Sequence, residues 1–165
     1  MNAMRTKRTQ KGVTLIEVLV AAFVLSVGLL GHSKIQALGV RAGTDANMRT
    51  QATYLLTEMM ERMRANRPAA DSNYYANFDY ASIDCSAALA KVCSEGVSGS
   101  AVQCSSDEIA NEDAKQWFCD VQDTLPNGNV SASVAAAVYS IQVSWDGLDE
   151  DGVTQNRNVS ATFIP

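Results

Sequence analysis

The chain has 165 residues, which allows one modest domain plus an anchor. Its formal net charge is −5, but residues 1–12 contain four basic residues and no acidic one, so the remainder carries −9. Such an acidic body argues against a broad nucleic-acid surface, and no nucleic-acid partner is expected. With a single histidine and no glycine-rich phosphate motif, the sequence also predicts neither an enzyme nor a bound cofactor.

The first predicted element is a long apolar helix that follows the basic leader at residues 1–12. Residues 13–31 carry one charged side chain, and nineteen residues suffice to cross a bilayer core as a helix. We therefore predict a transmembrane segment at residues 13–34. Because basic residues before a spanning segment stay in the cytoplasm, the acidic remainder is expected on the outer side of the membrane.

Glu17 is the one charged side chain in this apolar run. A carboxylate within a spanning segment costs about 2.5–3.5 kcal/mol on insertion scales, and residues 13–31 contain no cation to pair with it. Cleavage after Gly12 would create an α-amino group on Val13, four residues before Glu17. If two such helices pack with a small stagger, each charge meets its opposite on the neighbour, and this pairing is strong in a low dielectric. The pattern therefore favours assembly with other chains.

The stretch KGVTLIEVLVA, from Lys11 to Ala21, resembles the class III signal of type IV pilins and pseudopilins. The resemblance implies that a prepilin peptidase cuts between Gly12 and Val13, that Val13 becomes N-methylated, and that Glu17 acts in assembly. It also implies an inner-membrane precursor with a periplasmic head. The sequence departs from the usual pattern at Val13, where most members of the family have phenylalanine.

Two further stretches resemble the minor pilins of the PilV group, also called type IV pilus modification proteins. They are LSVGLLG at residues 25–31 and the run from Cys104 to Gly128. A removable secretory signal is the alternative interpretation of the N-terminus. Its apolar core usually has 7–15 residues followed by a small-residue cleavage site. The run here is longer and no such site follows it, so the anchor is favoured.

The pattern of apolar side chains changes at residues 35–67, from a uniformly apolar run to an apolar stripe. Apolar side chains recur at steps of three and four residues, which predicts an amphipathic helix continuous with the anchor. The long helix is therefore expected over residues 13–67 and is ended by Pro68. The apolar stripe consists of Ile35, Leu38, Ala42, Ala46, Met48, Ala52, Leu55, Leu56, Met59, Met60 and Met63.

Residues 68–165 are expected to form the globular head, beginning with a loop region that extends to Cys104 and contains a short helix at residues 86–93. This region is rich in small polar residues, and it includes an aromatic cluster. The cluster either covers the stripe of the long helix or contacts another subunit, and the first interpretation is favoured. Its members are Tyr74, Tyr75, Phe78 and Tyr80.

A second helix is predicted over residues 106–124. Ser105 and Glu108 have the spacing of a capping box, and Pro126 to Gly128 form a turn that ends the element. The apolar positions between them share one helical face, as expected for a helix that packs on a core. They are Ile109, Ala110, Ala114, Trp117, Phe118, Val121 and Leu125.

The C-terminal third predicts three strands, at residues 130–136, 139–145 and 159–163, of which the last two alternate apolar and polar side chains. An antiparallel meander packed on the second half of the long helix gives an α+β fold, and the resemblance adds the ladle shape of type IV pilins. The acidic loop at residues 146–152 lacks the ligand spacing of a calcium site, so we interpret it as a solvated hairpin tip and expect no metal.

The four cysteines, Cys85, Cys93, Cys104 and Cys119, all lie in the predicted outer part, which suggests two disulfides. They include no CxxC pair, which argues against zinc. If residues 106–124 are helical, Cys104 and Cys119 lie about 22 Å apart, whereas disulfide-bonded Cα atoms lie within about 7 Å. Two pairings remain open, and Cys93–Cys104 with Cys85–Cys119 is favoured over Cys85–Cys104 with Cys93–Cys119.

The sequence therefore predicts a minor type IV pilus subunit that takes part in assembly or initiation, with tip display or adhesion as a further role implied by the resemblance. Its expected partners are a prepilin peptidase, other major and minor pilins, and the inner membrane. A pseudopilin of a type II secretion system is the nearest alternative. A membrane-anchored periplasmic domain that never polymerises is the second.

Overall fold

The computed structural model describes residues 14–88, 92–93, 103–149 and 151–165. The chain divides into two units, Met1–Val40 and Arg41–Pro165, which we describe separately. Gly12 and Val13, which flank the predicted cleavage site, lie outside the described residues.

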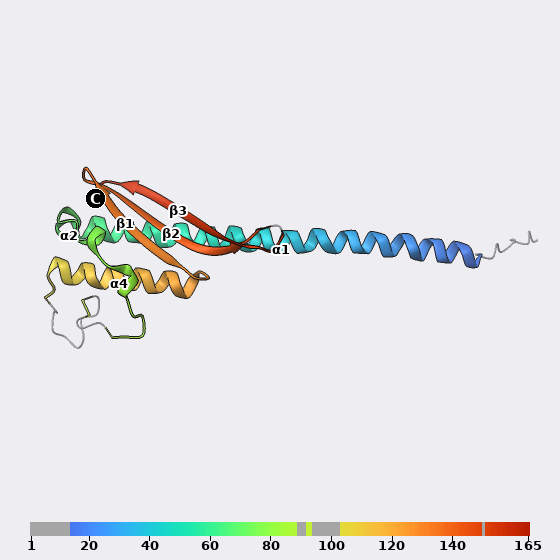
Figure 1. Ribbon diagram of the computed structural model, residues 1–165, viewed down its shortest axis with the longest axis horizontal. Helices are drawn as coiled ribbons and strands as arrows, with labels where there is room; N and C mark the ends of the chain where they lie inside the picture. The colour runs from blue at the N-terminus through green and yellow to red at the C-terminus, as the bar shows by residue number, and fades with distance from the viewer. Residues whose placement is uncertain (1–13, 89–91, 94–102, 150) are drawn as a thin grey trace, which may run out of the picture. The chain divides into compact units, whose positions relative to one another are not determined.

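Helix α1 extends over Leu15–Ala65 (Figure 1). Its first part belongs to the N-terminal unit and has no buried side chain, whereas its last turns belong to the head and bury Ala52, Leu55, Leu56, Met59 and Met63. All five belong to the predicted stripe. The helix ends two residues before the predicted position because Asn66 leaves helical geometry, with φ −108° and ψ 57°.

Three short helical elements follow where the sequence predicted a loop. They are α2 (Arg67–Asp71), α3 (Tyr74–Asn77) and the 3₁₀ turn η1 (Tyr80–Ser82). The loop prediction was therefore wrong for this segment. Pro68 lies in the first turn of α2, where the missing amide hydrogen costs nothing, so it begins a new helix as well as limiting α1.

Helix α4 spans Ser106–Thr124 and begins with the predicted capping box. The Ser105 hydroxyl accepts a hydrogen bond from the Glu108 amide at 3.2 Å, and the Glu108 carboxylate accepts one from the Ser105 amide at 2.8 Å. Two amide groups that the first turn cannot bond are thereby satisfied. The predicted apolar face is buried except at Ile109, which is 36% exposed.

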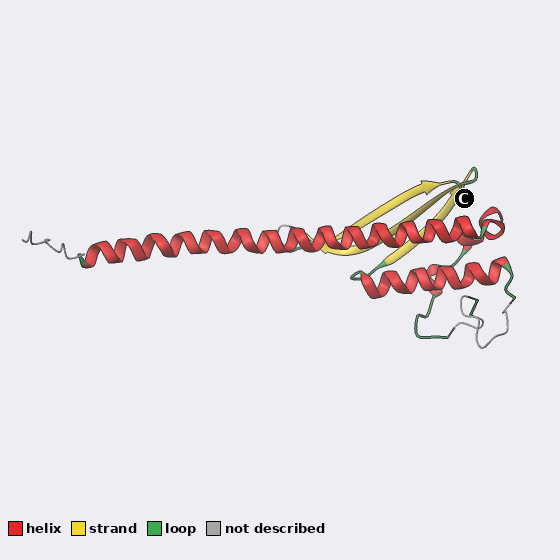
Figure 2. Cartoon of the chain, turned by 180° about the vertical axis from the view of Figure 1, so that it is seen from behind, coloured by secondary structure: helices red, strands yellow, loops and turns green. Residues whose placement is uncertain are grey.

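The sheet contains β1 (Asn129–Ala135), β2 (Val138–Leu148) and β3 (Thr154–Phe163) in the order β1-β2-β3, with both pairs antiparallel (Figure 2). Burial alternates along β2, so one face is directed to the core. The second half of α1, α4 and this face of the sheet share one apolar core. The structure therefore has the predicted α+β fold, a long helix packed on a small antiparallel sheet.

A buried hydrogen-bond network joins the end of α1 to α4. The Asn66 side chain donates to the Ser106 carbonyl at 2.7 Å and to the Tyr75 hydroxyl at 3.2 Å, and this hydroxyl donates to Asp113 at 3.0 Å. Arg62 lies 3.2 Å from the same carboxylate. Burial raises the pKa of Asp113, although the bonds from Tyr75 and Arg62 oppose the rise. These tertiary hydrogen bonds fix the start of α2, at Asn66, and Tyr75 of α3 against α4.

Two disulfides hold the segment before α4 against the helix. Cys85 is bonded to Cys119 and Cys93 to Cys104, with Cα–Cα distances of 5.6 and 6.0 Å. This is the favoured one of the two pairings that helix geometry left open. The buried carboxylate of Glu112 adds a non-covalent connection, because it accepts a hydrogen bond from the Cys93 amide.

Candidate assembly site

The N-terminal half of α1 presents an apolar surface that nothing in the described chain covers. By length and composition alone, the helix could cross a membrane, and none of its most apolar window is buried. A water-soluble protein rarely exposes apolar side chains on this scale, so the surface calls for lipid or another protein. The exposed side chains are Leu15, Ile16, Val18, Leu19, Val20, Phe23, Val24, Leu25, Val27, Leu29 and Leu30.

Glu17 lies in the first turn of this helix and is exposed. Its amide donates to the Thr14 carbonyl at 3.0 Å, so the carboxylate projects from regular helical backbone close to the positive end of the helix dipole. That dipole offers a carboxylate only a fraction of the stabilisation that a full cation gives. Glu17 therefore remains a charge that another positive group, such as an α-amino group, can neutralise.

The two serine side chains of the segment satisfy their hydrogen bonds within the helix. The Ser26 hydroxyl donates to the Ala22 carbonyl at 2.8 Å, and the Ser33 hydroxyl donates to the Leu29 carbonyl at 2.9 Å. Such bonding to the preceding turn removes the cost of placing a hydroxyl in lipid. Within the described residues 14–31, Glu17 is thus the charged group that needs an external partner.

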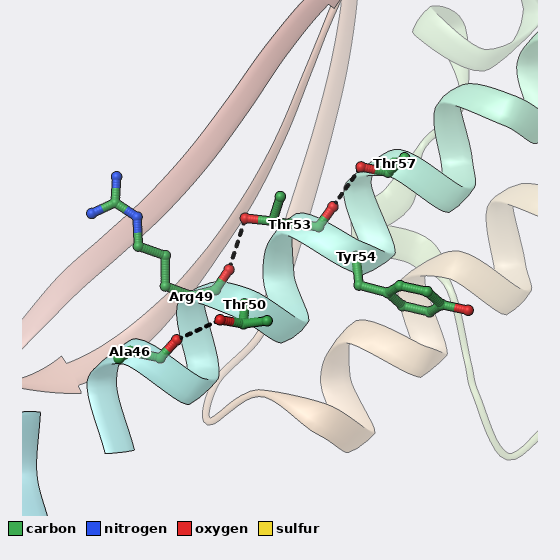
Figure 3. Close-up of a pocket in the computed structure, with 6 residues that line it drawn as sticks. All are labelled: Ala46, Arg49, Thr50, Thr53, Tyr54 and Thr57. Atoms are coloured by element: carbon green, nitrogen blue, oxygen red, sulfur yellow. Dashed lines mark hydrogen bonds between the residues drawn. The ribbon is translucent and has the colours of Figure 1, made fainter. Parts of the chain in front are cut away.

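The head portion of α1 has a second uncovered face, which the sequence analysis did not identify. It forms an open groove lined by Ala46, Arg49, Thr50, Thr53, Tyr54 and Thr57 (Figure 3). Each threonine hydroxyl donates to a carbonyl four residues earlier, at 2.8–2.9 Å, and Tyr54 is 71% exposed. With its hydroxyls satisfied, the face can pack against an apolar surface at little cost. In the sequence, the four-residue spacing of small residues was the signal that could have indicated this face.

In the acidic loop after β2, the carboxylate of Asp149 is hydrogen-bonded within the loop itself. Asp149 accepts hydrogen bonds from the amides of Asp151 and Val153, at 3.0 and 2.8 Å, and these backbone bonds hold its pKa below the ordinary value. Among the described residues, no group of three or more His, Cys, Asp or Glu side chains could hold a metal ion. His32 lies 2.9 Å from Gln36, within the same helix.

Comparison with known families bears on both parts of the chain. The family described as Type IV pilin Tt1218 matches residues 34–115, and the prokaryotic N-terminal methylation motif matches residues 7–31, a range that includes Gly12, Val13 and Glu17. No curated protein and no solved structure matches the chain. The methylation motif on the exposed apolar helix, the pilin match that extends into the head, and the helix-on-sheet fold together show that the chain belongs to the type IV pilins.

Proposed function

We propose that this protein is a minor type IV pilin of the PilV kind, which takes part in pilus assembly or initiation and in display or adhesion at the tip. The observation that carries the proposal is Glu17, one exposed carboxylate in an otherwise uncharged apolar run at residues 14–31 of the chain. A single chain in a membrane leaves that charge unpaired, whereas a bundle of processed helices pairs it with an α-amino group of a neighbour.

The proposed pathway begins with a precursor that spans the inner membrane once. The basic leader, residues 1–12, lies in the cytoplasm, residues 13–34 cross the membrane, and the head lies in the periplasm. Two disulfides in the head suit this oxidising compartment. Prepilin peptidase cuts between Gly12 and Val13, Val13 is methylated, and the helix then moves from lipid into the fibre.

Replacing Gly12 with glutamate is expected to leave an uncut precursor in the membrane. In the proposed cleavage site a residue without a side chain, Gly12, precedes the cut, and a long charged side chain there should prevent the peptide from entering the peptidase. Mass spectrometry of the envelope protein would report the N-terminus and the methyl group directly. Gln10→Glu, which adds the same side chain two residues earlier, should be processed normally. A mature-sized Gly12→Glu product would contradict the cleavage assignment.

A type II secretion pseudopilin would share the same signal and helix, so the fibre to which the chain belongs needs its own test. A tagged chain, crosslinked in the envelope and purified, is expected to carry pilus subunits with it. The uncut Gly12→Glu variant provides the control, because it should carry few of them. Recovery of secretion-system pseudopilins without pilus subunits would overturn the assignment to the pilus.

A further inference from the structure

A polar pocket lies at the end of the sheet where α1, β2 and β3 meet. It has a volume of about 270 Å³ and is lined by Asp45, Arg49, Trp145, Asn156, Arg157 and Asn158. All of these residues belong to the head unit. The pocket is separate from the apolar segment around Glu17, so its role can be tested independently of assembly.

Gly147 makes room for this pocket. The core-facing side of β2 is filled by buried side chains up to Trp145, and the next core-facing position is Gly147. A Cβ atom at Gly147 would lie 3.0 Å from Cγ of Arg157 and 3.2 Å from Oδ1 of Asp45. The glycine therefore allows two charged side chains to occupy the end of an otherwise apolar layer.

Three buried polar atoms of the pocket have no hydrogen-bond partner within the described protein. They are Oδ1 of Asp45, Nε1 of Trp145 and Nε of Arg157. Asp45 and Arg157 form an ion pair in which Oδ1 and Nε are 3.7 Å apart, a distance too long for a hydrogen bond between them. Trp145 is only 2% exposed, so its indole N–H is enclosed by the head. Buried groups without a hydrogen bond are uncommon and costly, and these two donors and one acceptor all belong to side chains that line the pocket, so a ligand that bonds to them there would gain free energy.

The charge of the pocket favours an anion. Arg49 and Arg157 contribute two guanidinium groups, against the single carboxylate of Asp45. The Arg49 guanidinium makes no hydrogen bond or ion pair with any side chain that the structure describes, and in Figure 3 it points away from Tyr54. The pocket thus has an excess positive charge on a head that is acidic as a whole.

We propose that the pocket binds a small hydroxy acid, a carboxylate with a neighbouring hydroxyl, of the size of a single sugar acid. The carboxylate would accept hydrogen bonds from Arg49, Arg157 and the Trp145 indole, since planar guanidinium groups match carboxylate geometry. The hydroxyl would donate to Oδ1 of Asp45. A simple carboxylate satisfies the donors but leaves Oδ1 of Asp45 without a hydrogen bond, and a neutral sugar leaves the excess positive charge of the pocket without a counter-charge.

The two tryptophans of the chain provide the measurement. Trp117, on α4, also has an indole N–H without a partner, but it does not line the pocket. In the full ¹⁵N-labelled chain in detergent micelles, addition of glucuronate should shift the Trp145 indole resonance saturably and leave the Trp117 resonance unchanged. Glucose should shift neither, and acetate should bind more weakly than glucuronate. A Trp145 resonance unmoved by glucuronate, or moved equally by glucose, would overturn the proposal.

Substitutions test the roles of the individual side chains. Arg49→Gln should raise the dissociation constant for glucuronate about tenfold or more, because a charge-assisted bond is lost, while Arg67→Gln, outside the pocket, should not change it. Asp45→Asn should strengthen acetate binding and remove the advantage of glucuronate over acetate. An unchanged Trp117 resonance shows that each variant is folded. Equal affinity of the Arg49→Gln and Arg67→Gln variants would place the ligand elsewhere.

Discussion

Replacing Glu17 with alanine is expected to retain the chain in the membrane and to remove it from the pilus. The substitution takes away one member of each charge pair in the helix bundle and leaves the neighbour's α-amino group unpaired. Breaking a buried pair in this way costs about 3–5 kcal/mol, which corresponds to a loss of incorporation of at least about a hundredfold. Immunoblots of sheared pili and of the membrane fraction would measure the two pools.

Ser26→Ala is the matched control for this experiment. It lies in the same apolar segment, and its hydroxyl bonds only to the preceding turn, so the variant should enter pili normally. Glu17→Gln, which keeps the shape and removes the charge, should behave like Glu17→Ala. Normal function of both Glu17 variants would instead support a membrane-anchored domain that does not polymerise.

Removing the Cys85–Cys119 disulfide is expected to be the most destabilising single change to the head. The bond closes a loop with a sequence separation of 34, and the chain-entropy relation gives a loss of about 4 kcal/mol in the free energy of unfolding. A loss of this size is a large fraction of the stability of a domain of this length. Chemical unfolding of the full chain with both cysteines replaced by serine, followed by tryptophan fluorescence, would measure it.

The second disulfide provides the comparison. Cys93–Cys104 closes a shorter loop, with a separation of 11, and its removal should cost about 3 kcal/mol. The Glu112 carboxylate would still hold the Cys93 amide after the bond is lost, which further limits the effect. A larger loss from the shorter loop would contradict the loop-entropy argument for this head.

Much of the fold could be predicted because its signals are local. The capping box at Ser105 and Glu108 gave the start of α4, and alternation from Tyr139 to Trp145 gave the central strand. For the disulfides, helix geometry excluded only the pairing that joins Cys104 to Cys119, because α4 separates these two cysteines too widely for a bond, and it left two pairings open.

The missed helices α2 and α3 are too short to form from local propensity alone. They are stabilised from a distance: the Tyr139 hydroxyl of β2 donates to the Ala70 carbonyl of α2 at 2.7 Å, and the side chain of Tyr75 in α3 is fully buried. These contacts arise from the packing of the sheet against the end of α1. The composition of this segment, which is rich in serine, asparagine and alanine, does not indicate that packing.

The two candidate sites also differ in whether local sequence signals reveal them. Glu17 could be identified from the sequence because a lone charge in an apolar run is unusual in itself. The hydroxy-acid pocket could not, because Asp45 on α1 and Arg157 on β3 lie 112 positions apart and meet only when the sheet packs on the helix, with Arg157 paired to Trp145 in the strand register. Gly147 was the single local sign, and a glycine near a hairpin tip is common.

The placement of the disulfides has a mechanical consequence. Both covalent links lie within residues 85–119, and neither includes α1 or the sheet. Apart from the backbone that leaves the end of α1 at Asn66, tension applied along α1 therefore reaches the rest of the head through the packed side chains around Met59 and Met63 and through the bonds of Arg62 and Asn66. The disulfides hold the α4 region together under such load, whereas the side-chain contacts between α1 and the rest of the head are non-covalent and can break and re-form.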